Sequence, residues 1–196
     1  MTQWEERLAE LRKPPLGTYH RGADLNRINL VESVAIVGSR NSSHEGVSAA
    51  REFGRLMASE DRVVISGLAL GIDTAAFEGA LDEGGVCIAV LPSGVDIITP
   101  TSNSNLAQRI TDSGGVLFSE LPEGTPPQRH TFIMRNRLIA ALSDTIVLGE
   151  SREDGGAWHT VREGWELNRE VFTLANDGGM TPLVNPQRDL DEYCTD

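Results

Sequence analysis

Some loops of this sequence carry the residue types that bind phosphate. Gly38-Ser39-Arg40 directly follows an apolar run over 34–37, and further Gly/Ser pairs follow later apolar runs. A glycine lets backbone N–H groups approach a phosphate closely because it has no Cβ atom. Serine hydroxyls add hydrogen bonds, and an arginine can donate two parallel bonds to phosphate oxygens. The pattern predicts a phosphate or nucleotide site assembled from several loops.

The predicted ligand-binding residues share a position just after an apolar run or near the start of a helix. They are Gly38, Ser39, Arg40, Ser66, Gly67, Leu68, Gly71, Asp73, Gly94, Asp96, Arg135, Asn136, Arg137, Gly155, Gly156 and Thr160. A helix N-terminus adds unpaired N–H donors and the positive end of the helix dipole. The sequence has neither the P-loop lysine motif nor GxGxxG, so it does not indicate a P-loop NTPase or an NAD-dependent dehydrogenase.

The charged members of this set have alternative roles. Arg135 and Arg137 stand at the start of a predicted helix whose continuation, 138–142, is apolar, which indicates anion binding at the mouth of a buried helix. The alternative is an ion pair with an acid such as Glu120 or Glu150. The carboxylates of Asp73 and Asp96 could bind a ribose hydroxyl or cap a helix.

Other reactive residue types are expected to be structural. His159 lies beside Trp158 at a helix start, and Trp158 and Trp165 share a helix face, which favours a core or an oligomer interface. Cys87 and Cys194 have neither disulfide nor metal-ligand spacing. We therefore expect no metal site and no bound cofactor, and a reducing cytoplasm fits best.

The elements that must position these loops follow from an alternating pattern. Helical periodicity separates short, continuously apolar runs, which lie over 34–37, 63–65, 86–91, 116–119, 145–148 and 170–174. Apolar strands alternating with helices predict an α/β fold with a doubly wound, mostly parallel sheet and helices on both faces. In such a sheet the ligand lies beyond the carboxyl ends of the strands.

The length of 196 residues predicts one domain with accessory segments. We expect an N-terminal helix and an extended or irregular arm over 1–33, the α/β domain over 34–176, and a polar tail over 177–196. The helix is predicted over 3–12, before Pro14-Pro15.

Composition limits the possible partners. The formal net charge is -12, which argues against a general polyanion binder. The basic residues gather locally, however, in a cluster of Arg129, His130, Arg135 and Arg137. No apolar run approaches the roughly 20 residues that a membrane span needs, and the N-terminus has no signal-peptide pattern, so no membrane partner is expected.

The series of motifs resembles the DNA-processing protein A (DprA/Smf) family over roughly residues 12–175. The resemblance is carried by segments that occur in the family's order. These segments include Val34-Ala35-Ile36-Val37-Gly38-Ser39-Arg40, Ser66-Gly67-Leu68-Ala69-Leu70-Gly71-Ile72-Asp73, Leu91-Pro92-Ser93-Gly94-Val95-Asp96, Ser119-Glu120-Leu121-Pro122 and Arg135-Asn136-Arg137-Leu138-Ile139-Ala140.

The resemblance implies an extended Rossmann-like domain, a homodimer, binding of single-stranded DNA and help in loading a RecA-type recombinase. Two residues depart from the family pattern. Leu70 stands where the family has an arginine that contacts DNA, and Phe77 where it has a histidine. Loss of one phosphate contact is expected to weaken DNA binding and lower its salt slope by about one.

Two alternatives remain open beside this DNA-processing function. The phosphate loops, with Leu70 and the negative charge, also fit a nucleotide or nucleotide-messenger binding protein, a sensor or sponge. A nucleoside-monophosphate phosphoribohydrolase is the second alternative, with Glu78 or Glu163 as candidate acid/base groups. Such enzymes carry the motif Pro-Gly-Gly-x-Gly-Thr-x-x-Glu. The stretch Gly155-Gly156-Ala157-Trp158-His159-Thr160 is only a loose match to it, so a binding protein is favoured over an enzyme.

Overall fold

The computed structural model describes residues 1–185, which contain one eight-stranded sheet with the order β1-β5-β4-β3-β2-β6-β7-β8. The six central strands are parallel, and β1 and β8 pair antiparallel at the two edges. The strands are β1 (Tyr19–Gly22), β2 (Val34–Val37), β3 (Val64–Ser66), β4 (Cys87–Val90), β5 (Val116–Ser119), β6 (Thr145–Leu148), β7 (Glu170–Leu174) and β8 (Met180–Pro182).

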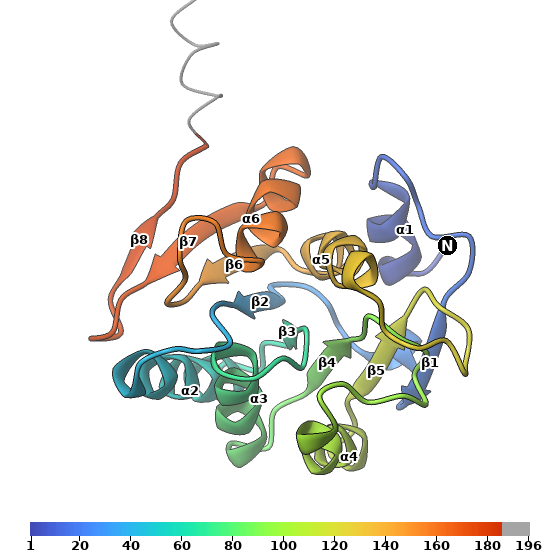
Figure 1. Cartoon of the computed structure of the whole chain (residues 1–196), viewed down its shortest axis with the longest axis horizontal. Coiled ribbons are helices and arrows are strands. Elements are labelled where there is room, and N and C mark those ends of the chain that lie inside the picture. The colour runs from blue at the N-terminus through green and yellow to red at the C-terminus, as the bar shows by residue number, and fades with distance from the viewer. Residues whose placement is uncertain (186–196) are drawn as a thin grey trace, which may run out of the picture.

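Helices cover both faces of the sheet. On one face lie α2, α3 and α4, and on the other α1, α5 and α6 (Figure 1). They are α1 (Gln3–Ala9), α2 (His44–Ser59), α3 (Ile72–Asp82), α4 (Ser104–Asp112), α5 (Arg129–Leu142) and α6 (Ala157–Glu166), with short 3-10 turns η1 (Leu25–Arg27) and η2 (Thr101–Asn103). The doubly wound α/β fold predicted from the sequence is confirmed.

The strand order places the switch point of the sheet between β2 and β6. From β2 the chain adds β3, β4 and β5 on one side, and it returns to add β6 and β7 on the other. Loops that leave neighbouring strands at such a point run in opposite directions and open a crevice between them. The loops after β2 and β6 are therefore placed to form a ligand site.

Alternate side chains of each central strand enter two separate cores. On β2, Val34 and Ile36 pack with α2 and α3, whereas Ala35 and Val37 pack with α5. Burial on both faces explains why the strands are continuously apolar rather than alternating. The packing of α2 on α3 also needs a glycine, because a Cβ atom on Gly79 would overlap the carbonyl oxygen of Arg51.

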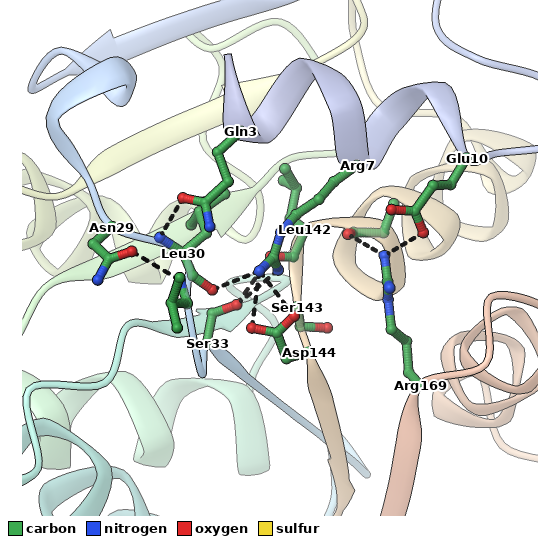
Figure 2. Close-up of polar contacts among 12 residues, drawn as sticks. Gln3, Arg7, Glu10, Asn29, Leu30, Ser33, Leu142, Ser143, Asp144 and Arg169 are labelled. Carbon is green, nitrogen blue, oxygen red and sulfur yellow. Dashed lines mark hydrogen bonds and ion pairs between the residues drawn. The ribbon is translucent and has the colours of Figure 1, made fainter. Parts of the chain in front are cut away.

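The N-terminal segment belongs to this core more closely than its sequence suggested. Tyr19–Gly22, in the part expected to be extended or irregular, pairs with β5 along the edge of the sheet. From α1 the buried Arg7 side chain reaches the carbonyl oxygens of Leu30 and Leu142, at 2.7 and 2.8 Å, and the carboxylate of Asp144 (Figure 2). These contacts join three segments that are distant in the sequence.

Some element boundaries also differ from the prediction. The helix predicted to start near Arg135 begins earlier, at Arg129, because the Thr131 hydroxyl accepts the N–H of Gln128 and caps an earlier first turn. Within 177–196, expected as a tail, Met180–Pro182 forms β8. Cys194 and the acidic residues of the last segment lie outside the described residues, whereas Cys87 is a buried free thiol in β4.

No helix within residues 1–185 has both the length and the apolar character needed to cross a bilayer. In the same residues, no group of three or more His, Cys, Asp or Glu side chains is arranged to hold a metal ion.

Candidate ligand cleft

A cleft of about 690 Å³ opens at the switch point, beyond the carboxyl ends of β2 and β6. Its walls are the loop after β2, the loop after β6, the start of α6 and the N-terminal half of α5. Nine of the residues predicted to bind ligand line it. They are Gly38, Ser39, Arg40, Asp73, Arg135, Asn136, Gly155, Gly156 and Thr160.

The cleft is basic although the chain is acidic. Its lining residues include four arginines, Arg40, Arg129, Arg135 and Arg152, and one carboxylate, Asp73. Arg40, Arg129 and Arg152 are exposed and come from three different segments. Arg152 pairs with Asp154 at 3.3 Å, but this pair is solvent-exposed, so all three guanidinium groups are accessible to an anion. With a net charge of -12 for the whole chain, this concentration of positive charge is local.

One aromatic ring stands beside the arginines. Phe132, on α5, is half-buried in the cleft wall, and the guanidinium carbon of Arg40 lies 4.9 Å from its ring centroid. This distance is within the range of a cation–π contact. The two side chains connect the loop after β2 to α5 and present a flat, partly apolar surface to the cleft.

Arg135 lies beneath the cleft rather than on its rim. Its side chain is buried and donates to the carbonyl oxygens of Gly67, at 2.7 Å, and of Val90. Burial lowers its pKa to about 10, so the guanidinium remains charged at neutral pH. A Cβ atom on Gly67 would overlap this guanidinium, so Gly67 makes room for Arg135.

Asp73 compensates part of this buried charge. One of its carboxylate oxygens accepts the N–H groups of Gly67 and Ala69, at 3.1 and 3.4 Å. Burial raises the pKa of the Asp73 carboxyl, while the charge of Arg135 acts in the opposite direction. These bonds hold the loop after β3 rather than cap a helix, which was one of the two roles considered from the sequence.

Three further predicted residues shape the loop after β3 without lining the cleft. The Ser66 hydroxyl is buried and donates to the carbonyl oxygen of Ile36 at 2.5 Å. Leu68 is fully buried at a φ of 59°, and Gly71 adopts a φ of 77° as the N-cap residue of α3. Leu70, between them, is 45% exposed and does not line the cleft.

The remaining predicted residues lie outside the cleft lining. Asp96 accepts the N–H of Gly124 at 3.0 Å, and the N–H of Gly94 donates to Thr125, so both belong to a second loop pair after β4 and β5. Arg137 forms a partly buried ion pair with Glu120, which is the alternative raised from the sequence. Glu150 does not pair with either arginine.

Glu150 occupies the donors at the start of α2 instead. Its carboxylate accepts the N–H and the hydroxyl of Ser43, the N-cap residue of that helix. Because these donors already have an anionic partner, the anion-binding groups left in the cleft are chiefly its arginine side chains.

Several lining residues were missed by the sequence pattern. Arg152 stands next to Glu153 and Asp154, and this sequence is typical of an ordinary charged loop, so it did not indicate a binding residue. Phe132 gave no signal because an isolated aromatic residue in a helix usually faces the core. Arg129 belongs to the basic cluster noted above but was not placed in the site, and His159 was expected to be structural although it lines the cleft.

Comparison with known proteins adds independent information. The family model of DNA recombination-mediator protein A matches residues 1–182. Protein Smf of Escherichia coli is 39% identical over 153 residues, covering 78% of this chain and 40% of that protein. Protein Smf of Synechocystis sp. is 36% identical, covering 86% and 43% respectively. The chain thus spans less than half the length of these two relatives.

Solved structures agree with the family match. DNA processing protein A from Streptococcus pneumoniae is similar with a TM-score of 0.78 and 33% identity, covering 86% of this chain and 58% of that one. A structure of DNA processing protein A from Helicobacter pylori, which describes a single-stranded DNA binding mode, matches with a TM-score of 0.80 and 26% identity over 98% and 85%.

Proposed function

This chain belongs to the DNA recombination-mediator protein A family, and from that premise we propose that its cleft binds single-stranded DNA. The observation that carries the proposal is the set of exposed arginines, Arg40, Arg129 and Arg152, around one cleft of an acidic chain. Because these arginines come from three different segments, they suit a ligand that carries several phosphates. The relative from Helicobacter pylori, with the same fold, binds single-stranded DNA.

The apolar wall of the cleft supports a strand rather than a free phosphate. Single-stranded DNA is bound by a basic groove together with side chains on which bases stack, and that stacking tolerates any base. Phe132 and the guanidinium of Arg40 provide such a surface beside the phosphate-binding groups. Gly156 also leaves room for close approach of the ligand, since no atom lies within 4 Å of a Cβ atom placed there.

An enzymatic function has less support. Glu78, one candidate acid/base group, lies on α3 and forms an ion pair with Arg51 of α2. Glu163 does not line the cleft, and within residues 1–185 the lining contains a single carboxylate, Asp73, whose oxygen is engaged with backbone N–H groups. We therefore propose a binding protein without a hydrolytic residue of its own in the cleft.

The proposal extends to partners. We propose that the chain forms a homodimer. The candidate interface contains Trp158 and Trp165 on α6, whose ring centroids lie 6.5 Å apart. A RecA-type recombinase is the proposed protein partner, and a reducing cytoplasm is the proposed setting. Size-exclusion chromatography with light scattering, comparing the wild type with Trp158→Ala, tests the dimer.

Fluorescence anisotropy of labelled oligo-dT tests DNA binding. Arg40→Ala and Arg152→Ala are each expected to weaken binding about tenfold, the value of one charge-assisted hydrogen bond. Arg27→Ala is the matched control, because Arg27 is exposed on η1 and does not line the cleft. Competition with unlabelled AMP and ADP separates DNA binding from nucleotide binding: displacement by a mononucleotide at low concentration would favour the sensor alternative.

A further inference from the structure

We propose that Glu150 is the positioning residue that holds Arg40 at the cleft, an inference that rests on the DNA-binding function proposed above. Glu150 lies two residues after the end of β6, and Arg40 lies in the loop after β2. These strands are neighbours, with Val37 paired to Leu148. The two loops therefore leave the sheet side by side.

Glu150 accepts hydrogen bonds from the loop after β2 on both sides of Arg40. Its carbonyl oxygen accepts the N–H of Ser39 at 2.8 Å, and its carboxylate oxygens accept the N–H of Ser43 at 3.1 and 3.0 Å. The Ser43 hydroxyl donates a further bond to the same carboxylate. One residue thus anchors the chain immediately before Arg40 and three residues after it.

The surroundings leave the carboxylate a defined place. A Cβ atom on Gly46 would lie 2.5 Å from a carboxylate oxygen of Glu150, so the glycine makes room for it. The positive end of the α2 dipole favours a negative charge at this position. The charge of Glu150 is therefore compensated by α2, and the Arg40 guanidinium remains over the Phe132 ring.

Glu150 also connects the loop that carries Arg40 to the cleft residues that follow β6. Ser151 and Arg152, which follow Glu150 directly, also line the cleft. A shift of the Glu150 anchor would change the spacing between the guanidinium groups of Arg40 and Arg152, and with it their fit to successive phosphates. A simple N-cap of α2 would affect only the stability of that helix.

NMR of the protein without DNA separates these roles. The side-chain protons of Arg40 are expected to be shifted upfield by the Phe132 ring, and Phe132→Leu gives the reference value without the ring. Glu150→Ala is expected to move the Arg40 signals to that reference, whereas Glu150→Gln, whose amide oxygen can still accept from Ser43, should retain the wild-type position. If Glu150→Ala does not fold, Ser43→Ala removes one donor and is expected to give an intermediate shift.

A double-mutant cycle with oligo-dT gives the functional readout. Arg40→Ala is expected to weaken binding about tenfold and to reduce the salt slope by about 0.7, the value for one phosphate of a single strand. Glu150→Ala should reproduce most of both changes, and adding it to Arg40→Ala should change little further. Arg129→Ala is the control, since it lies on α5 and should add independently to Glu150→Ala.

Two results would overturn the proposal. One is a Glu150→Ala or Ser43→Ala protein with a lowered Tm but unchanged Arg40 signals, which would make Glu150 a helix cap alone. The other is a wild type whose Arg40 signals equal those of Phe132→Leu. If the wild type does not bind oligo-dT, the proposed function fails, while the NMR experiment still decides whether Glu150 positions Arg40.

Discussion

Leu70 is the residue that, by the resemblance described above, stands in place of a DNA-contacting arginine. Its side chain is 45% exposed, next to Ala69, which lines the cleft. Leu70→Arg is expected to strengthen oligo-dT binding about tenfold, because it adds one charge-assisted contact near the rim. Anisotropy titrations over a range of salt concentrations should also show a steeper slope. Unchanged affinity and slope would mean that the strand does not pass this loop.

Gly67 makes a different contact in the structure from the one predicted from the sequence. It was expected to approach a phosphate, but it makes room for the buried guanidinium of Arg135. Gly67→Ala should lower the free energy of unfolding by about 1–3 kcal/mol through overpacking. Urea unfolding measures this change. Gly156→Ala is the control, because no atom lies within 4 Å of a Cβ there and its φ is -59°; equal losses in both variants would contradict the explanation.

At the scale of elements, α1 is attached to the core through a buried cation as well as through apolar packing. Arg7 donates to Leu30, Ser33, Leu142 and Asp144, so the positive charge meets the carboxyl end of α5 (Figure 2). Arg7→Met removes the cation and leaves Asp144 and the carbonyl oxygens without it. Asp144 is 37% exposed, so water still solvates its charge. The cost comes chiefly from the buried carbonyl oxygens of Leu30 and Leu142, which lose their donor, and is about 1–3 kcal/mol.

Chemical denaturation should therefore show a large loss of stability for Arg7→Met. Arg12→Met is the matched control, because Arg12 is exposed and its replacement should change stability by no more than about 0.5 kcal/mol. Since α5 also carries Arg129 and Phe132, the Arg7 variant should bind oligo-dT more weakly at temperatures where it is still folded. A variant as stable as the control would show that packing of Leu8 and Leu11 alone holds α1.

The elements of the central sheet were predictable because their signal is local. Continuous apolar runs such as 34–37 and 145–148 must be buried on both faces, and that requirement leaves few arrangements. The edge strands were not predictable in the same way. Tyr19–Gly22 is exposed along its whole length, so no hydrophobic pattern marks it, and its pairing with β5 depends on a contact about a hundred residues away.

The site was predictable in part for a similar reason. The carboxyl ends of parallel strands meet at one edge, and Gly38, Arg40 and Gly155, which follow such ends, line the same cleft. Whether a charged side chain faces the cleft or a neighbour depends on tertiary contacts, and these placed Arg137 on Glu120 and brought in Arg152. The sequence could name both possibilities for Arg137 but could not choose between them.

At the scale of the whole molecule, the chain carries a net charge of -12, and its described part contains a basic cleft. The acidic remainder repels polyanions, so long or double-stranded DNA should be disfavoured where it must cross the acidic surface. Oligo-dT should consequently compete better than duplex DNA of the same length in an anisotropy assay at about 50 mM salt. Stronger competition by the duplex would place the binding surface outside the cleft.

The salt dependence of oligo-dT affinity tests the central claim most directly. If phosphates bind Arg40, Arg129 and Arg152, the plot of log K against log salt should have a slope near -2, about -0.7 for each neutralised phosphate. The triple alanine variant, checked for an unchanged Tm, should lose nearly all of this slope together with its affinity. A triple variant that binds oligo-dT as tightly and as steeply as the wild type would show that this cleft is not the DNA site.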